Sequence, residues 1–335
     1  MCSKRSIVVQ KFGGTSLGTT ERINRAAYRV SQTIRNGEFP VVVASAMAGV
    51  TDNLVKLASL IKADRSDDEY DVIISAGEQI SAGLFASALN RLGIRAKSML
   101  SWQIPILARK CEESERSVLQ CRSENVKKAI DDEIVPVIAG FQGVTNDGRL
   151  VIFGRGGSDL TAVAVAASIF AKRCDIFTDV EGVYTADPRL VPKSRKIPFI
   201  SYELMLEMAE YGAKVLQEQS VSHAMENKVP VHVASSFNNN PGTMVGVCPA
   251  SARSVAGITL RPSLNEQTEI SIIGRDITSS KNVYTSVNEG LETLGINYAV
   301  SDGSINRISF IISDKHTEIA LNKLHTVCGL DVKEQ

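Results

Sequence analysis

The stretch VVQKFGGTS, residues 8–16, decides the fold and suggests the chemistry. An apolar, strand-like run leads into Lys11 and the pair Gly13-Gly14, and two hydroxyl residues then precede a helical pattern. Adjacent glycines let the backbone approach a ligand closely and adopt positive φ, and the N–H groups at a helix start favour an anion. With Lys11 at its rim, the stretch predicts a phosphate cradle. Taken alone, it fits a plain turn between a strand and a helix equally well.

Composition restricts the function classes. The 335 residues contain 37 Lys+Arg and 37 Asp+Glu, so the formal net charge is zero. Nucleic-acid binding needs a basic surplus, which this chain lacks. The longest apolar run, residues 160–171, is shorter than the ~20 residues of a membrane span, and the N-terminal run is too short for a signal peptide. We therefore expect a soluble, cytoplasmic protein of one large and one small domain, or of two medium ones, without nucleic-acid or membrane partners.

The cysteines and histidines do not form a pattern of metal ligands. The six cysteines show no CxxC spacing and the four histidines lie far from the glycine-rich motifs. Scattered cysteines in such a chain are typically reduced and structural. We therefore expect no metal site built from protein side chains and no Cys/His nucleophile pair.

Strand-like and helical segments alternate through the first two thirds of the chain. Helical spacing over residues 23–34 ends at Gly37, a buried-strand pattern covers residues 41–44, and helical spacing resumes from residue 54. Such repeats predict an α/β fold with a mainly parallel central sheet flanked by helices. A turn signal at residues 146–148 predicts a hairpin, and residues 202–216 predict an amphipathic helix.

A second glycine-rich loop, FGRGGSD at residues 153–159, opens a very apolar helix and carries Arg155. Two such loops, each with a cation, indicate sites for a polyphosphate and a second anion. The chain has neither the GxxxxGK[ST] loop nor the HRD and DFG motifs of protein kinases, and GRGGSD does not satisfy GxGxxG. What remains is a nucleotide enzyme of a third type.

These motifs resemble those of the aspartate kinases, members of the amino-acid kinase superfamily. The resemblance covers roughly residues 6–245, and its motifs occur in the order of the family: KFGGTS, SAMAGVTDN, SAGEQIS, GFQGVT, FGRGGSD, TDVEGVYTADPR, YGAKVL and NNPGT. It implies an amino-acid kinase catalytic domain over residues 1–248, with ATP, Mg²⁺ and L-aspartate as the ligands.

The resemblance also implies roles for individual residues. Lys11, Asp159 and Lys214 are the catalytic residues, with Asp159 as the organiser of the site. The implied nucleotide-binding set is Lys11, Gly13, Gly14, Thr178, Asp179, Tyr184, Arg189 and Lys214. The implied substrate-binding set is Ser45, Thr51, Glu78, Arg155 and Ser158.

Physical chemistry agrees with these roles. Aspartate carries one ammonium and two carboxylates, so its pocket needs an anion such as Glu78 and a planar cation such as Arg155. Its β-carboxylate, with a pKa of about 4, is ionised at neutral pH and needs no general base. Catalysis then rests on positioning and on cations, and Mg²⁺ bridges phosphate oxygens with few protein ligands.

Simpler interpretations stand beside several assignments. Asp159 can be the N-cap of its helix, and we expect it both to cap and to organise the site. Lys214 on an amphipathic helix is ordinarily a surface charge. Arg189 can be the partner of Asp187 in a loop salt bridge, and we expect Asp187 to hold that turn rather than to bind metal.

The C-terminal residues 253–335 resemble one ACT domain, a βαββαβ unit that pairs with copies of itself. Only β-α-β-β-α is evident there, so we expect VAGITL, residues 255–260, to supply the missing strand from the N-terminal side. The loop after the first strand reads GRDITSSKN and lacks the Pro-Gly common in the family. We therefore expect weak or absent feedback by lysine or threonine, and a tail that mainly holds a homodimer or higher oligomer.

The resulting prediction is an enzyme that makes 4-phospho-L-aspartate from ATP and aspartate, the first step toward lysine (through diaminopimelate), threonine and methionine. One alternative is an amino-acid kinase that acts on another acidic substrate such as glutamate. The other is a non-catalytic, amino-acid-sensing ACT protein with a relic kinase fold. The presence of Lys11, Arg155 and Asp159 disfavours the relic.

Overall fold

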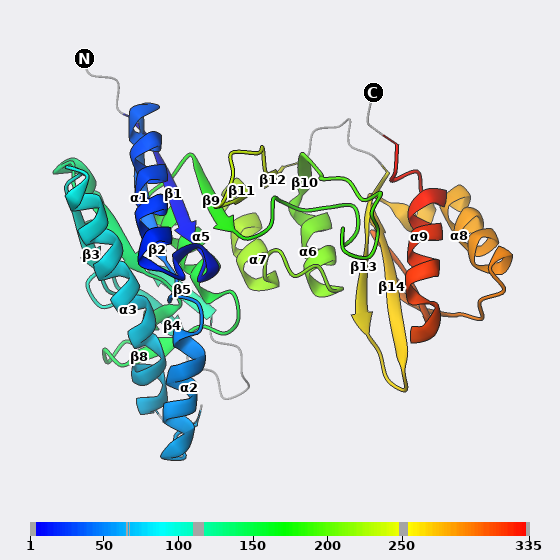
Figure 1. The fold of residues 1–335 in the computed structure, drawn as a ribbon, viewed down its shortest axis with the longest axis horizontal. Coiled ribbons are helices and arrows are strands. Elements are labelled where there is room, and N and C mark those ends of the chain that lie inside the picture. The colour runs from blue at the N-terminus through cyan, green and yellow to red at the C-terminus, as the bar shows by residue number, and fades with distance from the viewer. Residues whose placement is uncertain (1–4, 65, 67, 110–116, 248–253, 333–335) are drawn as a thin grey trace. The chain divides into compact units, whose positions relative to one another are not determined.

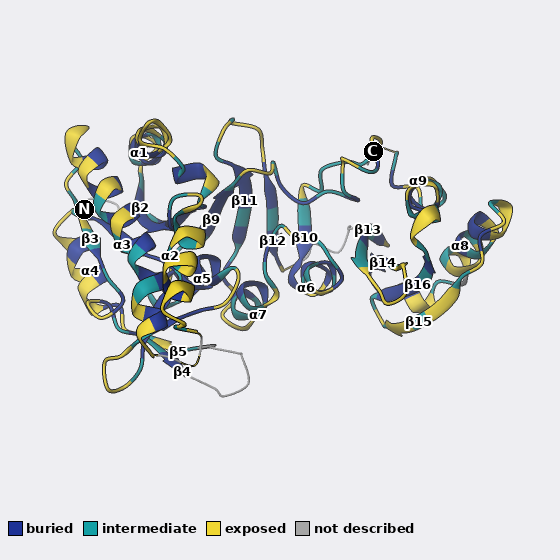
Figure 2. Ribbon diagram, turned by 60° about the horizontal axis from the view of Figure 1, so that its bottom comes forward, coloured by how far each residue is buried: buried dark blue, intermediate teal, exposed yellow. Residues whose placement is uncertain are grey.

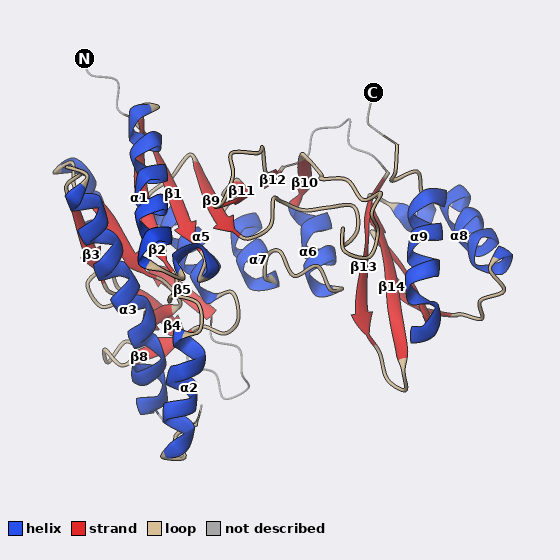
Figure 3. Cartoon of the chain, viewed as in Figure 1, coloured by secondary structure: helices blue, strands red, loops and turns tan. Residues whose placement is uncertain are grey.

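The computed structural model describes residues 5–64, 66, 68–109, 117–247 and 254–332. The chain divides into two compact units, residues 1–181 with 222–241 and residues 182–221 with 242–335. Figures 1 and 3 show alternating strands and helices in the first unit and a small sheet with two helices near the C-terminus. The predicted boundary at residues 248–253 lies outside the described residues, as do Cys2, Cys111 and Cys248.

The first unit is built on a parallel sheet with the strand order β11-β9-β1-β2-β6-β3. Its strands are β1 (Ser6–Phe12), β2 (Glu38–Ala44), β3 (Ala96–Met99), β6 (Val135–Ala139), β9 (Arg173–Thr178) and β11 (Val231–Ser235). Its helices are α1 (Thr20–Arg35), α2 (Val50–Leu60), α3 (Asp68–Arg91), α4 (Glu124–Asp131) and α5 (Gly157–Ser168), and α7 (Glu218–Glu226) crosses into it from the second unit. The predicted α/β fold with a mainly parallel sheet is confirmed.

A smaller sheet lies beside this one, with the order β5-β4-β7-β8. Its strands are β4 (Ile106–Arg109), β5 (Ser117–Cys121), β7 (Gln142–Val144) and β8 (Leu150–Ile152). β7 and β8 form the hairpin predicted from the Asn-Asp-Gly turn, with Gly148 at a φ of 85°.

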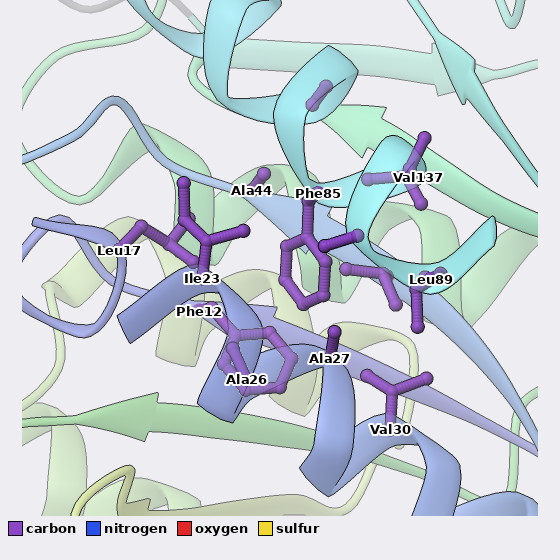
Figure 4. Close-up of a cluster of buried hydrophobic side chains, with 14 of the residues drawn as sticks. Phe12, Leu17, Ile23, Ala26, Ala27, Val30, Ala44, Phe85, Leu89 and Val137 are labelled. Atoms are coloured by element: carbon purple, nitrogen blue, oxygen red, sulfur yellow. The ribbon is translucent and has the colours of Figure 1, made fainter. Parts of the chain in front are cut away.

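An apolar core fixes β1 against the helices of one sheet face. The ring of Phe12 contacts that of Phe85 in α3 edge to face, with 5.2 Å between the ring centroids. Its centroid lies 5.0 Å from that of Phe177 in β9. Figure 4 shows the surrounding side chains from α1, α3, β2 and β6 turned toward this ring. Complete burial of one such phenyl ring contributes about 1.5–3 kcal/mol to stability. The end of β1, where the glycine pair begins, is therefore rigidly held.

Alternation along β1 sends successive side chains to opposite sheet faces. Phe12 packs with α1 and α3, whereas Lys11 on the other face meets α5. Figure 2 shows the inner faces of α1 and α3 buried and their outer faces exposed, whereas α5 is buried almost all round. Lys11 and α5 therefore supply one side of the functional site, at the carboxyl ends of the strands.

Helix α3 is a core element. By length and composition it could cross a membrane, but 56% of its most apolar window is buried inside the protein. It packs against β3, β6, β8 and α1. Core helices of soluble proteins meet the same criteria, so α3 is explained by the fold.

The second unit contains β10 (Phe199–Ser201) paired in parallel with β12 (Thr243–Gly246), and α6 (Tyr202–Glu210). It also contains an antiparallel sheet in the order β13-β14-β16-β15. The remaining elements are β13 (Val255–Pro262), β14 (Gln267–Gly274), α8 (Lys281–Thr293), β15 (Ala299–Ser304), β16 (Arg307–Ser313) and α9 (Thr317–Val327).

The strand hypothesis for the ACT-like tail is confirmed. β13 pairs antiparallel with β14, with Ile258 opposite Ile272 and Leu260 opposite Ile270. It thereby completes the sheet at the edge beyond the first strand of the β-α-β-β-α series. β13, which precedes the β-α-β-β-α series in the chain, thus takes the place of the strand that the tail lacks at its C-terminal end.

The helix predicted over residues 202–216 was wrong in its length. α6 ends at Glu210, and Gly212 adopts a φ of 114°. A Cβ at Gly212 would lie only 1.8 Å from the carbonyl oxygen of Leu260 in β13. This close approach requires glycine and ends the helix, so Lys214 lies in a loop and not on a helix face.

Candidate active site

Lys11 projects from the carboxyl end of β1 into the space between the sheet and α5. β1 pairs in parallel with β2 on one side and β9 on the other. Open parallel sheets bind ligands outside the carboxyl ends of their strands. Lys11 is 9% exposed, and its Nζ lies 2.6 Å from Oδ1 of Asp159, which is 7% exposed. The two residues therefore form a nearly buried ion pair at the expected ligand edge.

Gly14 is required by packing and not by positive φ, whereas a Cβ on Gly13 would meet only ordinary contacts, the nearest at 3.5 Å. Gly14 has a φ of −59°, and Gly13 is likewise absent from the left-handed region. A Cβ on Gly14 would lie 2.9 Å from the carbonyl oxygen of Ala46. The expectation of positive φ was wrong. The close approach at Gly14 is to the backbone of Ala46, and the expected close approach to a ligand stays a prediction.

A short 3₁₀ turn, Thr15–Leu17, follows the glycine pair, and α1 begins only at Thr20. The sequence predicts that a helix starts soon after the glycines. In the structure the 3₁₀ turn separates them from α1. Thr19 caps α1 by accepting a hydrogen bond from the backbone N–H of Arg22. Any anion held here would meet the N–H groups of the turn before those of α1.

The second glycine loop does use the left-handed conformation. Gly156 has a φ of 73° and is the N-cap residue of α5. Asp159 lies in the first turn of that helix, so the prediction that it would be the N-cap was wrong. A carboxylate in the first turn still interacts favourably with the helix dipole. The loop thus places Asp159 opposite Lys11.

Glu78 is a buried carboxyl group from the middle of α3. Its Oε1 accepts a hydrogen bond of 3.1 Å from the backbone N–H of Ala46. Its Oε2 is buried and has no hydrogen-bond partner among the described residues. Burial raises the pKa of Glu78 to about 7, an effect that the Ala46 hydrogen bond only partly opposes. The group is thus suited to meet a cationic ligand group.

These elements enclose a pocket of about 290 Å³, close to the lower limit of about 300 Å³ for small-molecule sites. Predicted residues from five separate segments line it: Lys11, Gly14, Ser45, Thr51, Glu78 and Ser158. Residues 46–49, Phe141 and the start of α5 complete the wall. One cation, one partly titrating anion and several hydroxyls therefore converge on a cavity of small-molecule size.

Two predicted residues from the same loop region do not line this pocket. Arg155 is exposed, although its neighbour Gly156 belongs to the wall. Asp159 lies behind Lys11, its ion-pair partner. The structure therefore brings Glu78 and Lys11 to one cavity and leaves Arg155 at the surface of the second glycine loop.

Phe141 is a wall residue that was not singled out from the sequence. It has a φ of 67°, uncommon for a non-glycine residue. Its backbone N–H donates to Oγ1 of Thr161, and its carbonyl accepts from Phe153. Phe141 lies within the GFQGVT motif, but no local pattern marks it as a wall residue of the pocket.

The candidate nucleotide residues fall in both units. In the first, Thr178 ends β9 and donates through Oγ1 to Oδ1 of the exposed Asp179 at 3.1 Å. In the second, Tyr184 forms an isolated β-bridge with Lys196, and Lys214 lies exposed between α6 and α7.

Arg189 is also in the second unit. Its largely exposed guanidinium lies 2.6 Å from Asp187, which also accepts from the backbone N–H of Arg189. The predicted turn-holding role of Asp187 is confirmed.

No group of three or more His, Cys, Asp or Glu side chains able to hold a metal occurs in the described part of the chain. Cys121, Cys174 and Cys328 are free thiols. A divalent cation at the Lys11 edge would therefore take most of its ligands from phosphate and water.

Comparisons with known proteins agree with this geometry. An aspartokinase of Geobacillus stearothermophilus is 39% identical over 331 residues, spanning 97% of this chain and 80% of the relative. An aspartate kinase of Pseudomonas putida is 44% identical over 242 residues, spanning 72% and 59% of the two chains.

Solved structures show the same fold. The aspartate kinase of Synechocystis matches with a TM-score of 0.64 at 28% identity, covering 98% of this chain and 70% of the other. Aspartokinase III of E. coli, in complex with aspartate and ADP, matches with a TM-score of 0.83 at 22% identity, covering 96% and 99%. The model of the amino acid kinase family matches residues 6–235, and the chain belongs to that family.

Proposed function

We propose that this chain is an ATP-dependent aspartate kinase (EC 2.7.2.4). It transfers the γ-phosphoryl group of ATP to the β-carboxylate of L-aspartate and yields 4-phospho-L-aspartate. Relatives named aspartokinase cover most of the chain and support this assignment. The observation that carries it is the pocket in which buried Lys11 meets Oε2 of Glu78, an oxygen without a hydrogen-bond partner among the residues that the structure describes.

Glu78 binds the ammonium group of the substrate. Its Oε1 is already fixed by the N–H of Ala46, so Oε2 remains for the ligand. An ammonium at Oε2 favours the ionised carboxylate and so lowers the raised pKa of Glu78. Ser45, Thr51 and Ser158 supply hydroxyls for the substrate carboxylates. Arg155, exposed on its loop, binds one carboxylate bidentately when substrate is present.

Lys11 acts on the phosphates of ATP. The attacking carboxylate is already ionised, so the main obstacle is repulsion between two anions. Asp159 orients the ammonium of Lys11, and Gly13 and Gly14 bring the backbone close to the β- and γ-phosphates. The N–H of Gly13 already donates to the carbonyl oxygen of Phe177 at 3.0 Å, so Gly14 supplies the N–H for the phosphates. In-line positioning then completes the catalysis.

The remaining assignments concern ATP and its metal. Thr178, Asp179, Tyr184, Arg189 and Lys214 bind the nucleotide, with Lys214 near the phosphates. Mg²⁺ bridges phosphate oxygens and keeps several waters, in keeping with the donor set of the described residues.

The domain organisation is part of the proposal. Residues 1–248 form the catalytic domain, and residues 253–335 form an ACT-like domain that holds a homodimer or higher oligomer. The protein is soluble, and we propose that it acts in the cytoplasm, at the entry to lysine, threonine and methionine synthesis.

A substrate panel with ADP release as the readout tests the function. Aspartate is expected to support turnover with ATP and Mg²⁺, whereas glutamate is not. Turnover with glutamate alone would identify a different amino acid kinase, and ATP binding without turnover on any acid would favour a sensing protein.

A further inference from the structure

Thr185 lies in the segment between β9 and β10 and is bonded through its N–H, its carbonyl and its hydroxyl. Its backbone N–H donates to the carbonyl of Arg195 at 2.8 Å, and its carbonyl accepts from Ile258 of β13 at 2.7 Å. Its Oγ1 accepts from the N–H of Arg195 and lies 2.9 Å from Nε2 of His325. Thr185 directly follows Tyr184 and is 7% exposed. One buried residue thus ties this loop to both β13 and α9.

His325 is completely buried on α9, where only its bond to Thr185 satisfies the ring among the described residues. Since Oγ1 of Thr185 already accepts an N–H from Arg195, its own proton is available for Nε2. The bond is made either by the hydroxyl proton to Nε2 or by an Nε2 proton to the second lone pair of Oγ1, and the ring is neutral in both cases. Burial lowers the pKa of His325, which agrees with the neutral form.

A buried, half-satisfied imidazole costs stability compared with an apolar residue of similar shape. The interior of the second unit could have been filled by leucine here, as it is by Leu321 and Leu324 on the same helix. What His325 provides instead is a directional bond to one atom of the loop. The geometry therefore favours a positioning role over simple packing.

Further contacts fix the same loop to the C-terminal segment. Nδ2 of Asn322 donates to the carbonyl of Leu190 at 3.0 Å, and Nε of Arg195 donates to the carbonyl of Asp331 at 2.7 Å. Ala186 and Val191 are buried in the same apolar cluster as Leu321 and Leu324 of α9. The loop that carries Tyr184 and Arg189 is therefore held on the hydrophobic core of the ACT-like sheet.

We propose that His325 is a positioning residue for the nucleotide. Through Thr185 it fixes the backbone between Tyr184 and Arg189, so that helix α9 forms part of the ATP-binding apparatus even without an effector. This inference rests on the proposed nucleotide role of Tyr184 and Arg189. It assigns a function in ATP binding to a residue of the C-terminal module.

Matched substitutions at both ends of the bond test the proposal. Thr185→Val removes the hydroxyl at nearly constant volume, whereas Thr185→Ser keeps it. His325→Leu removes the ring nitrogen that bonds to Oγ1 of Thr185, whereas His325→Gln keeps a polar group at the end of the side chain. Loss of one positioning hydrogen bond is expected to raise KM and the calorimetric Kd for ATP about tenfold in Thr185→Val and His325→Leu. KM for aspartate should change less than about twofold, and the Ser and Gln variants should stay close to wild type.

Ile319→Ala, an exposed position on the same helix, is the control for nonspecific effects on α9. The double variant Thr185→Val/His325→Leu should bind ATP no worse than Thr185→Val alone, because Thr185→Val already removes the bond to His325 together with the one from the N–H of Arg195. The proposal would be overturned if KM for ATP and KM for aspartate rose equally, and in proportion to the fall in melting temperature. If one variant fails to fold, the variant at the other end of the bond gives the same test.

Tyr184→Ala and Arg189→Ala separate this inference from the function on which it rests. If they leave the Kd for ATP unchanged, the loop does not bind nucleotide and the inference fails. If they weaken ATP binding but Thr185→Val and His325→Leu do not, His325 has no positioning role. If wild-type protein binds ATP but does not phosphorylate aspartate, the proposed function fails, while the binding measurements still decide the role of His325.

Discussion

Nζ of Lys11 and Oδ1 of Asp159 lie 2.6 Å apart, with both side chains about 10% exposed. Lys11 comes from the first strand and Asp159 from the first turn of α5. The pair links the two glycine-rich loops on the α5 face of the sheet. It supplies a fixed cation at the edge of the pocket and a partner that holds this cation in place.

Lys11→Met is expected to reduce kcat/KM at least 100-fold, because removal of one preorganised donor to a developing charge typically has this effect. It also leaves Asp159 buried without its cation, which is expected to cost about 3 kcal/mol of unfolding free energy. Steady-state kinetics and urea denaturation measure the two effects. The double variant Lys11→Met/Asp159→Asn should recover stability but not activity, and recovery of activity would contradict the role of Lys11.

Glu78→Gln is expected to stabilise the unliganded protein at pH 8. The folded pKa is about 7 and the ordinary value is 4.5. The folded state therefore binds more protons than the unfolded state within this window, and its stability falls as pH rises from about 4.5 through 7. The difference between the folded and the ordinary pKa corresponds to about 3 kcal/mol of unfolding free energy. Thermal melts should show Glu78→Gln above wild type at pH 8 and close to it at pH 5.

The same substitution should weaken aspartate binding, because the amide cannot pair with an ammonium group. KM for aspartate is expected to rise about 100-fold, with KM for ATP nearly unchanged. In the wild type, KM for aspartate should rise as pH falls below 7, where Glu78 becomes protonated. A pH-independent KM would indicate that Glu78 does not contact the substrate.

Gly14→Ala is expected to lower both activity and melting temperature. The added Cβ would lie 2.9 Å from a backbone oxygen, that of Ala46, whose own N–H binds Glu78. Gly83→Ala is the matched control, since a Cβ there meets nothing within 4 Å and Gly83 lies inside α3. The control should be stabilised by about 0.5–1 kcal/mol. A fully active Gly14→Ala enzyme would show that close approach at the glycine pair is dispensable.

Feedback inhibition is expected to be weak or absent. Gly274 is kept at the end of β14, but a Cβ there would lie 2.0 Å from the carbonyl oxygen of Ser254, so packing alone requires this glycine. Its retention is therefore no sign of an effector site. Initial rates with lysine, threonine or both should be unchanged up to millimolar concentrations. A sub-millimolar inhibition constant for either amino acid would contradict this prediction.

Local patterns predicted most of the fold. The strand before Lys11, the helix ended by Gly37 and the hairpin at Gly148 depend on neighbouring residues, and all are present. The hypothesis that β13 completes the ACT-like sheet also held, because an apolar strand needs a partner edge.

Contacts between distant segments account for the errors. Gly212 ends α6 because Leu260 approaches it, and Gly14 is needed because Ala46 does. Neither contact is visible in a local pattern. The sequence motifs correctly predicted Lys11, Glu78 and Ser158 as residues of one site. Phe141 and the Thr185–His325 bond depend on tertiary structure alone.

The most direct test of the central claim is product trapping with hydroxylamine. Purified protein with ATP, Mg²⁺ and L-aspartate is expected to form β-aspartyl hydroxamate in equal amount to the ADP released, and Lys11→Met should form almost none. Glutamate in place of aspartate should give no hydroxamate. ADP release without aspartyl hydroxamate, or hydroxamate formed from glutamate alone, would contradict the assignment of this chain as an aspartate kinase.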